Sequence, residues 1–418
     1  MLSNLRGLYE KYRLVTEPNW NEVDAFYKTR SQDNGKTIKK YNMPGRDAIL
    51  SYEAVVEELR SLYSRELVGT VVRLNHLGDV VLNDLLFEDY VHKNVGMLGT
   101  PSSPQEATAT SSVRTQLAVF DMGNVSCQIR EFFARQPEGI TSRDIVALVL
   151  RILWSASLSP GHHPPGKVIE AIEKTQKNAI RCAVVSRALP SGLQRWVAST
   201  CCNLKEVLDV RKTARDTLRS QCPAYTALHT AHLIDTLYFA GGLAIPQLLT
   251  AGLAVLYAPG SPLGANSRPL VKSNVRSFVY EVARVFPAVG VVPYHDVLSD
   301  RGVLLLLRTA LRDPAVWGGG ADIEFRVRPR CQYEPKMQEV AWANAATGPG
   351  TQGRGCPATA LSIAILEQFF EAVQQEQHLW ELIPPVEPIR FGATVTGMLG
   401  IRRKQFNGKI TIPYLTSV

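Results

Sequence analysis

The spacing of apolar residues predicts helices over much of the chain. Within residues 52–67, Val55, Leu59 and Leu62 recur every three or four positions, which is typical of an amphipathic helix. The same spacing runs almost without a break over 142–256, where turn-forming sequences interrupt it only briefly. This middle region is therefore expected to be a helix bundle.

Shorter β-prone runs lie outside that region, and they predict small sheets. They fall at 70–74, 79–82, 289–293 and 302–307. We expect a mixed α+β entry region over 1–100, a helix bundle over 110–260, and a third region over 261–418. In the third region, one helix is expected from about Pro269 to Phe286. A second is expected after residue 360 and is expected to end at about Trp380.

Two segments predict irregular structure. Residues 97–113 are small and polar, which is typical of a surface loop, and 313–360 are rich in glycine and proline. A third segment, 237–257, carries no charge and is long enough to cross a bilayer. It contains Pro246 and has no basic flanks, so a buried central helix distorted at Pro246 is expected instead of a membrane span.

Composition excludes several classes of protein. The chain has 418 residues, is 45% hydrophobic and carries a formal charge of +8, so it can bury a core and is not disordered. Its lysines and arginines are scattered and do not alternate with aromatic residues, which argues against a nucleic-acid partner. Seven cysteines without paired spacing, and the lack of an apolar leader, favour a reducing compartment. A cytoplasmic protein, or one dissolved within an organelle, is expected, and peripheral membrane contact stays an open alternative.

Candidate chemistry gathers around Cys356. A glycine-rich loop precedes this residue and a predicted amphipathic helix follows it. Loop glycines let backbone N–H groups approach a sulfur, a helix N-terminus stabilises negative charge, and Arg354 adds a cation. These features favour a thiolate, although a small buried cysteine before a helix is more often structural.

A second candidate is the charged pair Glu281 and Arg284. At a spacing of three residues on a helix the two side chains share a face and can form a bidentate ion pair. Downstream, an irregular arm carries Arg326, Arg328 and Arg330, any of which could join Glu281. The alternative for these three arginines is a solvated basic strand.

The order of these elements resembles the haem-thiolate cytochrome P-450 superfamily. That family has an ExxR helix, then an arm with an Asp-Pro-x-x-Trp-like sequence, then an Arg-x-Cys-Pro segment before a helix, and the resemblance covers about 231–373. It implies a single haem-thiolate domain over 1–418, mainly α with small β-sheets, in which haem b lies between a long central helix and the cysteine loop.

The resemblance also implies roles for individual residues. Cys356 would be the axial ligand of the iron, and Glu281 with Arg284 would form the structural ion pair. The remaining residues implied to contact haem are Arg354, His295, Arg114, Gly355 and Gly350. Arg114 is expected at the start of an apolar helix that follows the 97–113 loop. The haem loop departs from the family pattern at Pro349, Gln352 and Ala358.

The central helix departs from the family in a way that bears on the reaction. Where members that activate dioxygen carry an acid and then a threonine, this chain has Leu243 and Ala244, which cannot relay protons. A substrate that already contains an O–O bond needs no such relay, because a thiolate ligand pushes electron density toward the iron. The sequence therefore favours a fatty acid hydroperoxide, rearranged or cleaved without a reductase or added dioxygen.

Allene oxide synthases and hydroperoxide lyases are similar to this chain in further details. They carry paired glycines in the central helix, as at Gly241 and Gly242, and a Trp-x-Asn sequence before the haem loop, as at 342–344. Their asparagine three residues before the glycines is Tyr238 here, and a core-packing aromatic is an equal alternative for that residue. Leu243, Ala244 and Val289 would line the acyl chain.

Two other functions stay open. The first is a monooxygenase or peroxygenase that hydroxylates a lipid or natural product, and its monooxygenase form would need a redox partner. The second is an interaction protein that keeps the fold with or without haem.

Overall fold

The computed structural model of the protein describes most of the core elements of the chain. The described residues are 32–33, 36–37, 40–43, 46–67, 72–73, 104–136, 138–157, 164–175, 178, 191–201, 203–236, 244–263, 274–296, 301–318, 325–326, 328, 330–346, 355–376, 379–385, 387–391, 395–398 and 400–404.

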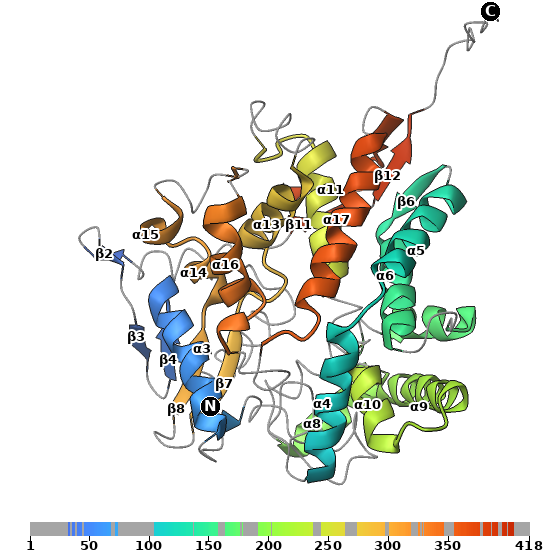
Figure 1. The fold of residues 1–418 in the computed structure, drawn as a ribbon, viewed down its shortest axis with the longest axis horizontal. Coiled ribbons are helices and arrows are strands. Elements are labelled where there is room, and N and C mark those ends of the chain that lie inside the picture. The colour runs from blue at the N-terminus through green and yellow to red at the C-terminus, as the bar shows by residue number, and fades with distance from the viewer. Residues whose placement is uncertain are drawn as a thin grey trace, which may run out of the picture.

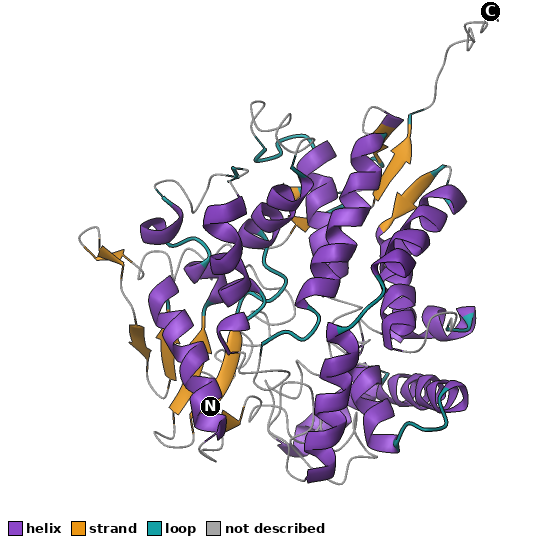
Figure 2. Cartoon of the chain, in the orientation of Figure 1, coloured by secondary structure: helices purple, strands orange, loops and turns teal. Residues whose placement is uncertain are grey.

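Helices make up most of the described chain (Figure 2). In chain order they are α3 (Tyr52–Leu67), α4 (Pro104–Ala118), α5 (Met122–Arg135), α6 (Ser142–Ser157), α8 (Ser191–Cys201), α9 (Leu204–Gln221), α10 (Ala227–Thr236), α11 (Ile245–Tyr257), α13 (Val275–Val285), α14 (Leu307–Ala310), α15 (Pro314–Trp317), α16 (Arg330–Ala341), the 3-10 turn η4 (Asn344–Ala346) and α17 (Thr359–Gln375).

The strands form small sheets at the edges of the helical body. They are β1 (Gln32–Asp33), β2 (Lys36–Thr37), β3 (Lys40–Met43), β4 (Arg46–Ile49), β5 (Val72–Arg73), β6 (Gly139–Thr141), β7 (Val292–Asp296), β8 (Arg301–Leu305), β9 (Trp380–Leu382), β10 (Arg390–Phe391), β11 (Val395–Thr396) and β12 (Gly400–Arg403). The largest sheet has the order β3-β4-β8-β7-β5, and within it only β4 and β8 are parallel. A second sheet has the order β6-β12-β9.

The core centres on α11, which packs against α6, α13 and α17 (Figure 1). Almost every residue of α11 is buried, as expected for a helix that is hydrophobic all round. Gly252 allows α11 and α17 to pack closely, because a Cβ atom at this position would lie 2.2 Å from Cζ of Phe370 on α17. The packed pair α11 and α17 thus sets the position of the segment that leads into α17.

The expected fold class is confirmed, since the protein is mainly helical with small sheets. The helix over 52–67 and the bundle between 142 and 256 are present. The strands β7 and β8 lie close to the β-prone runs at 289–293 and 302–307, and β5 lies within 70–74. The run at 79–82 lies outside the described residues.

The expectation of a loop over 97–113 was wrong for its second half, where α4 begins at Pro104. Proline suits the first turn of a helix, and Val113 and Leu117 are fully buried on one side of α4. Tertiary packing thus stabilises a helix whose alanines, serines and threonines give little apolar periodicity.

The expectation of irregular structure over 313–360 was also wrong in part. This stretch contains α15, α16 and η4. Pro335 lies inside α16, where packing of α16 on α13 and α3 accompanies the missing backbone hydrogen bond.

Two element ends also differ from expectation. The helix expected from Pro269 is described from Val275, where the Asn274 side chain accepts a hydrogen bond from the Ser277 N–H at 3.0 Å and caps it. The last long helix ends at Gln375, and Trp380 begins β9. Pro246 is the second residue of α11, and residues 237–243, which the expected central helix includes, lie outside the described residues.

The uncharged segment 237–257 does not supply a membrane-crossing helix in the described chain. Its described part is α11, which has 13 residues, and no described helix has both the length and the apolar character that a bilayer span requires.

Candidate functional site

Glu281 and Arg284 form a buried bidentate ion pair on α13. Arg284 donates from Nε to Glu281 Oε2 at 2.9 Å and from its NH2 group to Oε1 at 2.7 Å. The two side chains are 3% and 1% exposed, so the charges are removed from water and depend on each other. Arg284 also donates to the Leu311 carbonyl at 3.1 Å.

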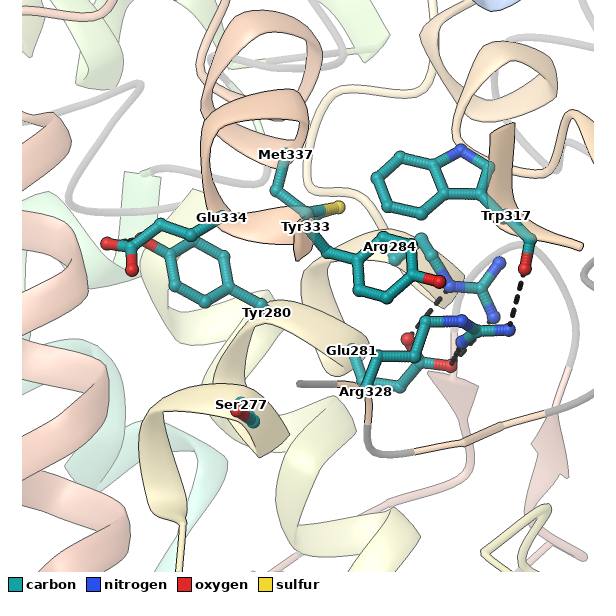
Figure 3. A pocket seen from close by; sticks show the side chains of 9 residues that line it. All are labelled: Ser277, Tyr280, Glu281, Arg284, Trp317, Arg328, Tyr333, Glu334 and Met337. Carbon is teal, nitrogen blue, oxygen red and sulfur yellow. Dashed lines mark hydrogen bonds and ion pairs between the residues drawn. The ribbon is translucent and has the colours of Figure 1, made fainter. Parts of the chain in front are cut away.

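Arg328 completes this cluster. Its NH1 group donates to Glu281 Oε1 at 2.6 Å, and its NH2 group donates to the Trp317 carbonyl at 3.4 Å (Figure 3). The backbone N–H of Arg326 donates to the same carboxylate oxygen at 2.8 Å. Arg330 begins α16.

The Glu281 cluster joins distant parts of the chain. It links α13 to the end of α15 and to the arm before α16, and the rings of Trp317 and Tyr333 stack beside it at a centroid distance of 5.4 Å (Figure 3). Among the described residues, the polar bonds of Glu281 all go to these neighbours, so the cluster is suited to holding elements together and not to proton transfer.

Cys356 lies in the short segment that leads into α17. Its backbone N–H donates to the Trp342 carbonyl at 2.8 Å. The side chain of Trp342 is buried, and its indole N–H donates to Ser362 of α17 at 2.8 Å. The segment after α16 therefore fixes the position of the Cys356 backbone relative to the first turn of α17.

Arg114 reaches this loop from α4. Its side chain is buried, and its NH2 group donates to the carbonyl of Gly355. Arg114 lies within α4, near its C-terminal end, and not at the start of a helix as the sequence suggested. The buried guanidinium of Arg114 thus contacts the residue directly before Cys356.

The surroundings of the Cys356 thiol act on its charge in opposite directions. Burial raises the pKa of Cys356, whereas the Ala358 backbone N–H, the positive charge of Arg114 and the Thr359 hydroxyl lower it. Burial is the largest of these effects. The N–H donor, the cation and the hydroxyl are nevertheless all arranged to stabilise a sulfur anion once a positive partner compensates for the lost water.

The other predicted site residues are placed as follows. His295 lies in β7, opposite Arg73 of β5 and Gly302 of β8. Ala244 directly precedes α11, and Val289, between α13 and β7, is 45% exposed. The remaining predicted residues lie outside the described residues, namely Tyr238, Gly241, Gly242, Leu243, Gly350 and Arg354.

Two polar residues beside Cys356 had no assigned role at the sequence level. Thr359 lies 2.8 Å from the Cys356 carbonyl oxygen and 3.0 Å from Oδ1 of Asn344, both measured from its hydroxyl oxygen. Asn344 belonged to the Trp-x-Asn sequence that contributed to the resemblance. The sequence did offer one signal for a role of Thr359, because a hydroxyl residue at the predicted start of a helix lies three positions after the candidate ligand.

Solved structures similar to this chain are cytochromes P-450, although no protein-family model and no curated protein sequence matches it. Epothilone D-bound cytochrome P450epoK aligns with a TM-score of 0.60 at 16% identity, over 93% of this chain and 98% of that one. P450BioI, in complex with an acyl carrier protein ligated to hexadec-9Z-enoic acid, has a TM-score of 0.59 at 13% identity, over 93% and 99%.

A third similar structure is the tirandamycin C-bound P-450 monooxygenase TamI, with a TM-score of 0.55 at 16% identity. The alignment covers 92% of this chain and 98% of that one. Near-complete coverage of both chains in all three alignments means that the similarity extends over the whole architecture. The chain therefore has the cytochrome P-450 fold.

Proposed function

We propose that this protein is a haem-thiolate enzyme in which the Cys356 sulfur would hold haem b, and that it oxygenates a lipid or natural product as a monooxygenase or peroxygenase. The observation that carries the proposal is the placement of Cys356 within this fold. The thiol lies just before α17, which packs against the central α11, and the Ala358 N–H, the Thr359 hydroxyl and the charge of Arg114 act on it.

The residues present fit a haem-thiolate site. A buried thiol is disfavoured as an anion by itself, because burial raises its pKa. Bound iron supplies the missing positive charge and deprotonates a coordinating thiol. Arg114 is buried beside the loop, and we assign Arg114, His295 and Arg354 to the haem propionates, with Gly350 and Gly355 in the loop beside the porphyrin.

When bound, a haem with an axial thiolate supplies O–O bond activation. The protein's own residues then orient the ligand and hold the substrate. Arg114 and Trp342 fix the backbone of the cysteine loop. Ala244 and Val289 are apolar, and with Leu243 they would contribute the substrate wall and exclude water.

The ligands of similar structures support an apolar substrate. Epothilone D, an acyl chain on a carrier protein and tirandamycin C are bound to the three similar proteins, and the third is named a monooxygenase. For this chain, a redox partner is proposed with the monooxygenase form of the reaction.

A second candidate function is rearrangement or cleavage of a fatty acid hydroperoxide. It is favoured by Leu243 and Ala244, which leave two positions of the central helix without a proton-donating side chain. Such a substrate brings its own O–O bond and needs neither reductase nor added dioxygen. Tyr238, Gly241 and Gly242 are the residues proposed to steer the product in this case.

One set of assays separates the two functions. Purified protein is mixed with linoleate hydroperoxide, and the absorbance of its conjugated diene is followed. In parallel, NADPH with ferredoxin and its reductase is supplied with candidate lipids. Turnover that depends on the electron donors supports the monooxygenase, and diene loss without them supports the second candidate.

Ala244→Thr sharpens this comparison. A restored hydroxyl can pass a proton, so the variant is expected to raise product per NADPH consumed if the protein is a monooxygenase. It should leave hydroperoxide turnover unchanged or lower it. Cys222→Ser serves as the control for Cys356→Ser, because Cys222 ends α9, away from the cysteine loop. Equal activity of the two serine variants would contradict the proposal.

A further inference from the structure

The backbone around Cys356 is anchored at three consecutive polar groups. The Gly355 carbonyl accepts from Arg114, the Cys356 N–H donates to the Trp342 carbonyl, and the Cys356 carbonyl accepts from the Thr359 hydroxyl. The anchors come from α4, from the segment after α16, and from the first turn of α17. Each fixes a different atom of the loop, so the direction of the Cα–Cβ bond of Cys356 is strongly determined.

Thr359 differs from the other two anchors because its hydroxyl has two possible hydrogen-bond acceptors. Its hydroxyl oxygen lies 2.8 Å from the Cys356 carbonyl and 3.0 Å from Oδ1 of Asn344. A hydroxyl has one proton and cannot donate fully to two oxygens. The two ends of an asparagine amide are nearly the same shape, and turning the amide places its NH2 group against the Thr359 oxygen. In that orientation Asn344 would donate to Thr359, and Thr359 would keep its proton for the Cys356 carbonyl.

The segment that carries Asn344 is itself held rigidly. Ala343 has a φ of 53°, a left-handed conformation that costs a non-glycine residue free energy. The preceding indole of Trp342 donates to Ser362. Ser362 in turn donates to the Thr359 carbonyl at 2.9 Å. These bonds tie the segment to α17 at Trp342, two residues before the asparagine.

Stabilising the start of α17 does not account for this arrangement. The residue that precedes α17, Ala358, has no side chain able to cap the helix. Thr359 does not act in its place, because its hydroxyl points toward the Cys356 carbonyl and Asn344. The pair is aimed at the candidate ligand.

We propose that Asn344 and Thr359 are positioning residues that orient Cys356 and withdraw electron density from its sulfur through a directed chain of hydrogen bonds. The inference rests on the proposed haem-thiolate function. A donor to the ligand segment reduces the electron density that the sulfur gives to iron, and such outer hydrogen bonds tune a metal centre. Loss of the chain should therefore shift the haem reduction potential to more negative values.

The test measures the haem reduction potential and the Soret band of the reduced carbon monoxide complex in the holoprotein. Thr359→Val removes the hydroxyl and keeps the side-chain shape, and Asn344→Leu removes its partner. Both should shift the potential in the negative direction, and the double variant should shift it no further than Thr359→Val alone. Thr359→Ser should restore the wild-type value.

Two further variants keep the test decisive. Thr230→Val removes a buried hydroxyl of α10 that donates to the carbonyl of Thr226, the residue before that helix, and it should leave the potential unchanged. Asn344→Asp offers only acceptors, so it should draw the Thr359 proton away from Cys356 and give the same negative shift. It serves as the substitute if Thr359→Val does not fold.

The failure of this inference differs from failure of the proposed function. Variants with the wild-type potential and an intact thiolate spectrum would overturn the positioning role of Asn344 and Thr359 alone. A wild-type protein that shows no thiolate-ligated haem spectrum would overturn both proposals.

Discussion

Removal of the charge on Glu281 tests whether the buried ion cluster holds α13, α15 and the arm before α16 together. Glu281→Gln keeps the size of the side chain but leaves Arg284 and Arg328 buried against a neutral amide. The wild-type carboxylate accepts four hydrogen bonds, three of them from guanidinium groups. Breaking a buried pair by removing one partner costs about 3–5 kcal/mol, because the remaining charges stay uncompensated.

That magnitude translates into a measurable shift in Tm. The entropy of unfolding for a chain of 418 residues is about 0.9 kcal/mol/K near 60 °C. A loss of about 3–5 kcal/mol therefore lowers Tm by about 3–6 °C, which differential scanning calorimetry resolves. Arg328→Met should cost less than Glu281→Gln, because it leaves the pair of Glu281 and Arg284 complete.

The control is Glu381→Gln, which removes one partner of an exposed pair. Glu381 accepts from Arg402 at 2.8 Å, and the two side chains are 39% and 46% exposed. Exposed pairs contribute at most about 1 kcal/mol, so this variant should shift Tm by about 1 °C or less. If Glu281→Gln shifts Tm no more than this control, the cluster does not hold the elements together as described.

Two other predictions concern packing and pH. Gly252→Ala forces the Phe370 ring out of its contact, so it should lower the free energy of unfolding by about 1–3 kcal/mol in urea titrations. Gly166→Ala is the control, because the space around Gly166 is open and the variant should keep the wild-type stability. Equal effects of the two variants would contradict the packing of α11 on α17. Burial lowers the pKa of His229, whose Nε2 lies 3.0 Å from Gln116 Oε1. The unfolded chain therefore binds a proton more readily, so stability is full above the ordinary histidine pKa of about 6.5 and falls as pH drops through it. His229→Gln should reduce this loss in urea titrations between about pH 7 and pH 5, and an unchanged slope would refute the reasoning.

The sequence was most informative where burial sets the pattern. The helix α3 was predictable because its buried positions recur with helical spacing. The helix α13 was predicted with nearly its observed end, but its start was placed at Pro269 instead of Val275. The ion pair of Glu281 and Arg284 followed from their spacing on one helix. The fold class also followed from the order of motifs, although no protein-family model matches the chain.

Features fixed by distant contacts were not predictable. Helix α4 has few apolar residues and depends on packing against α6, α10 and α17. The bond of Arg328 to Glu281 joins positions 47 residues apart. The bond between Asn344 and Thr359 joins positions 15 residues apart, and neither residue type predicts such a contact by itself.

The central claim is that the Cys356 sulfur binds haem iron, and one absorption spectrum tests it most directly. Purified protein loaded with haem is reduced with dithionite and exposed to carbon monoxide. The long-wavelength Soret band typical of a thiolate-ligated haem is expected for the wild type and for Cys222→Ser, and its loss is expected for Cys356→Ser. A wild-type protein without that band, or a Cys356→Ser variant that keeps it, would contradict the account.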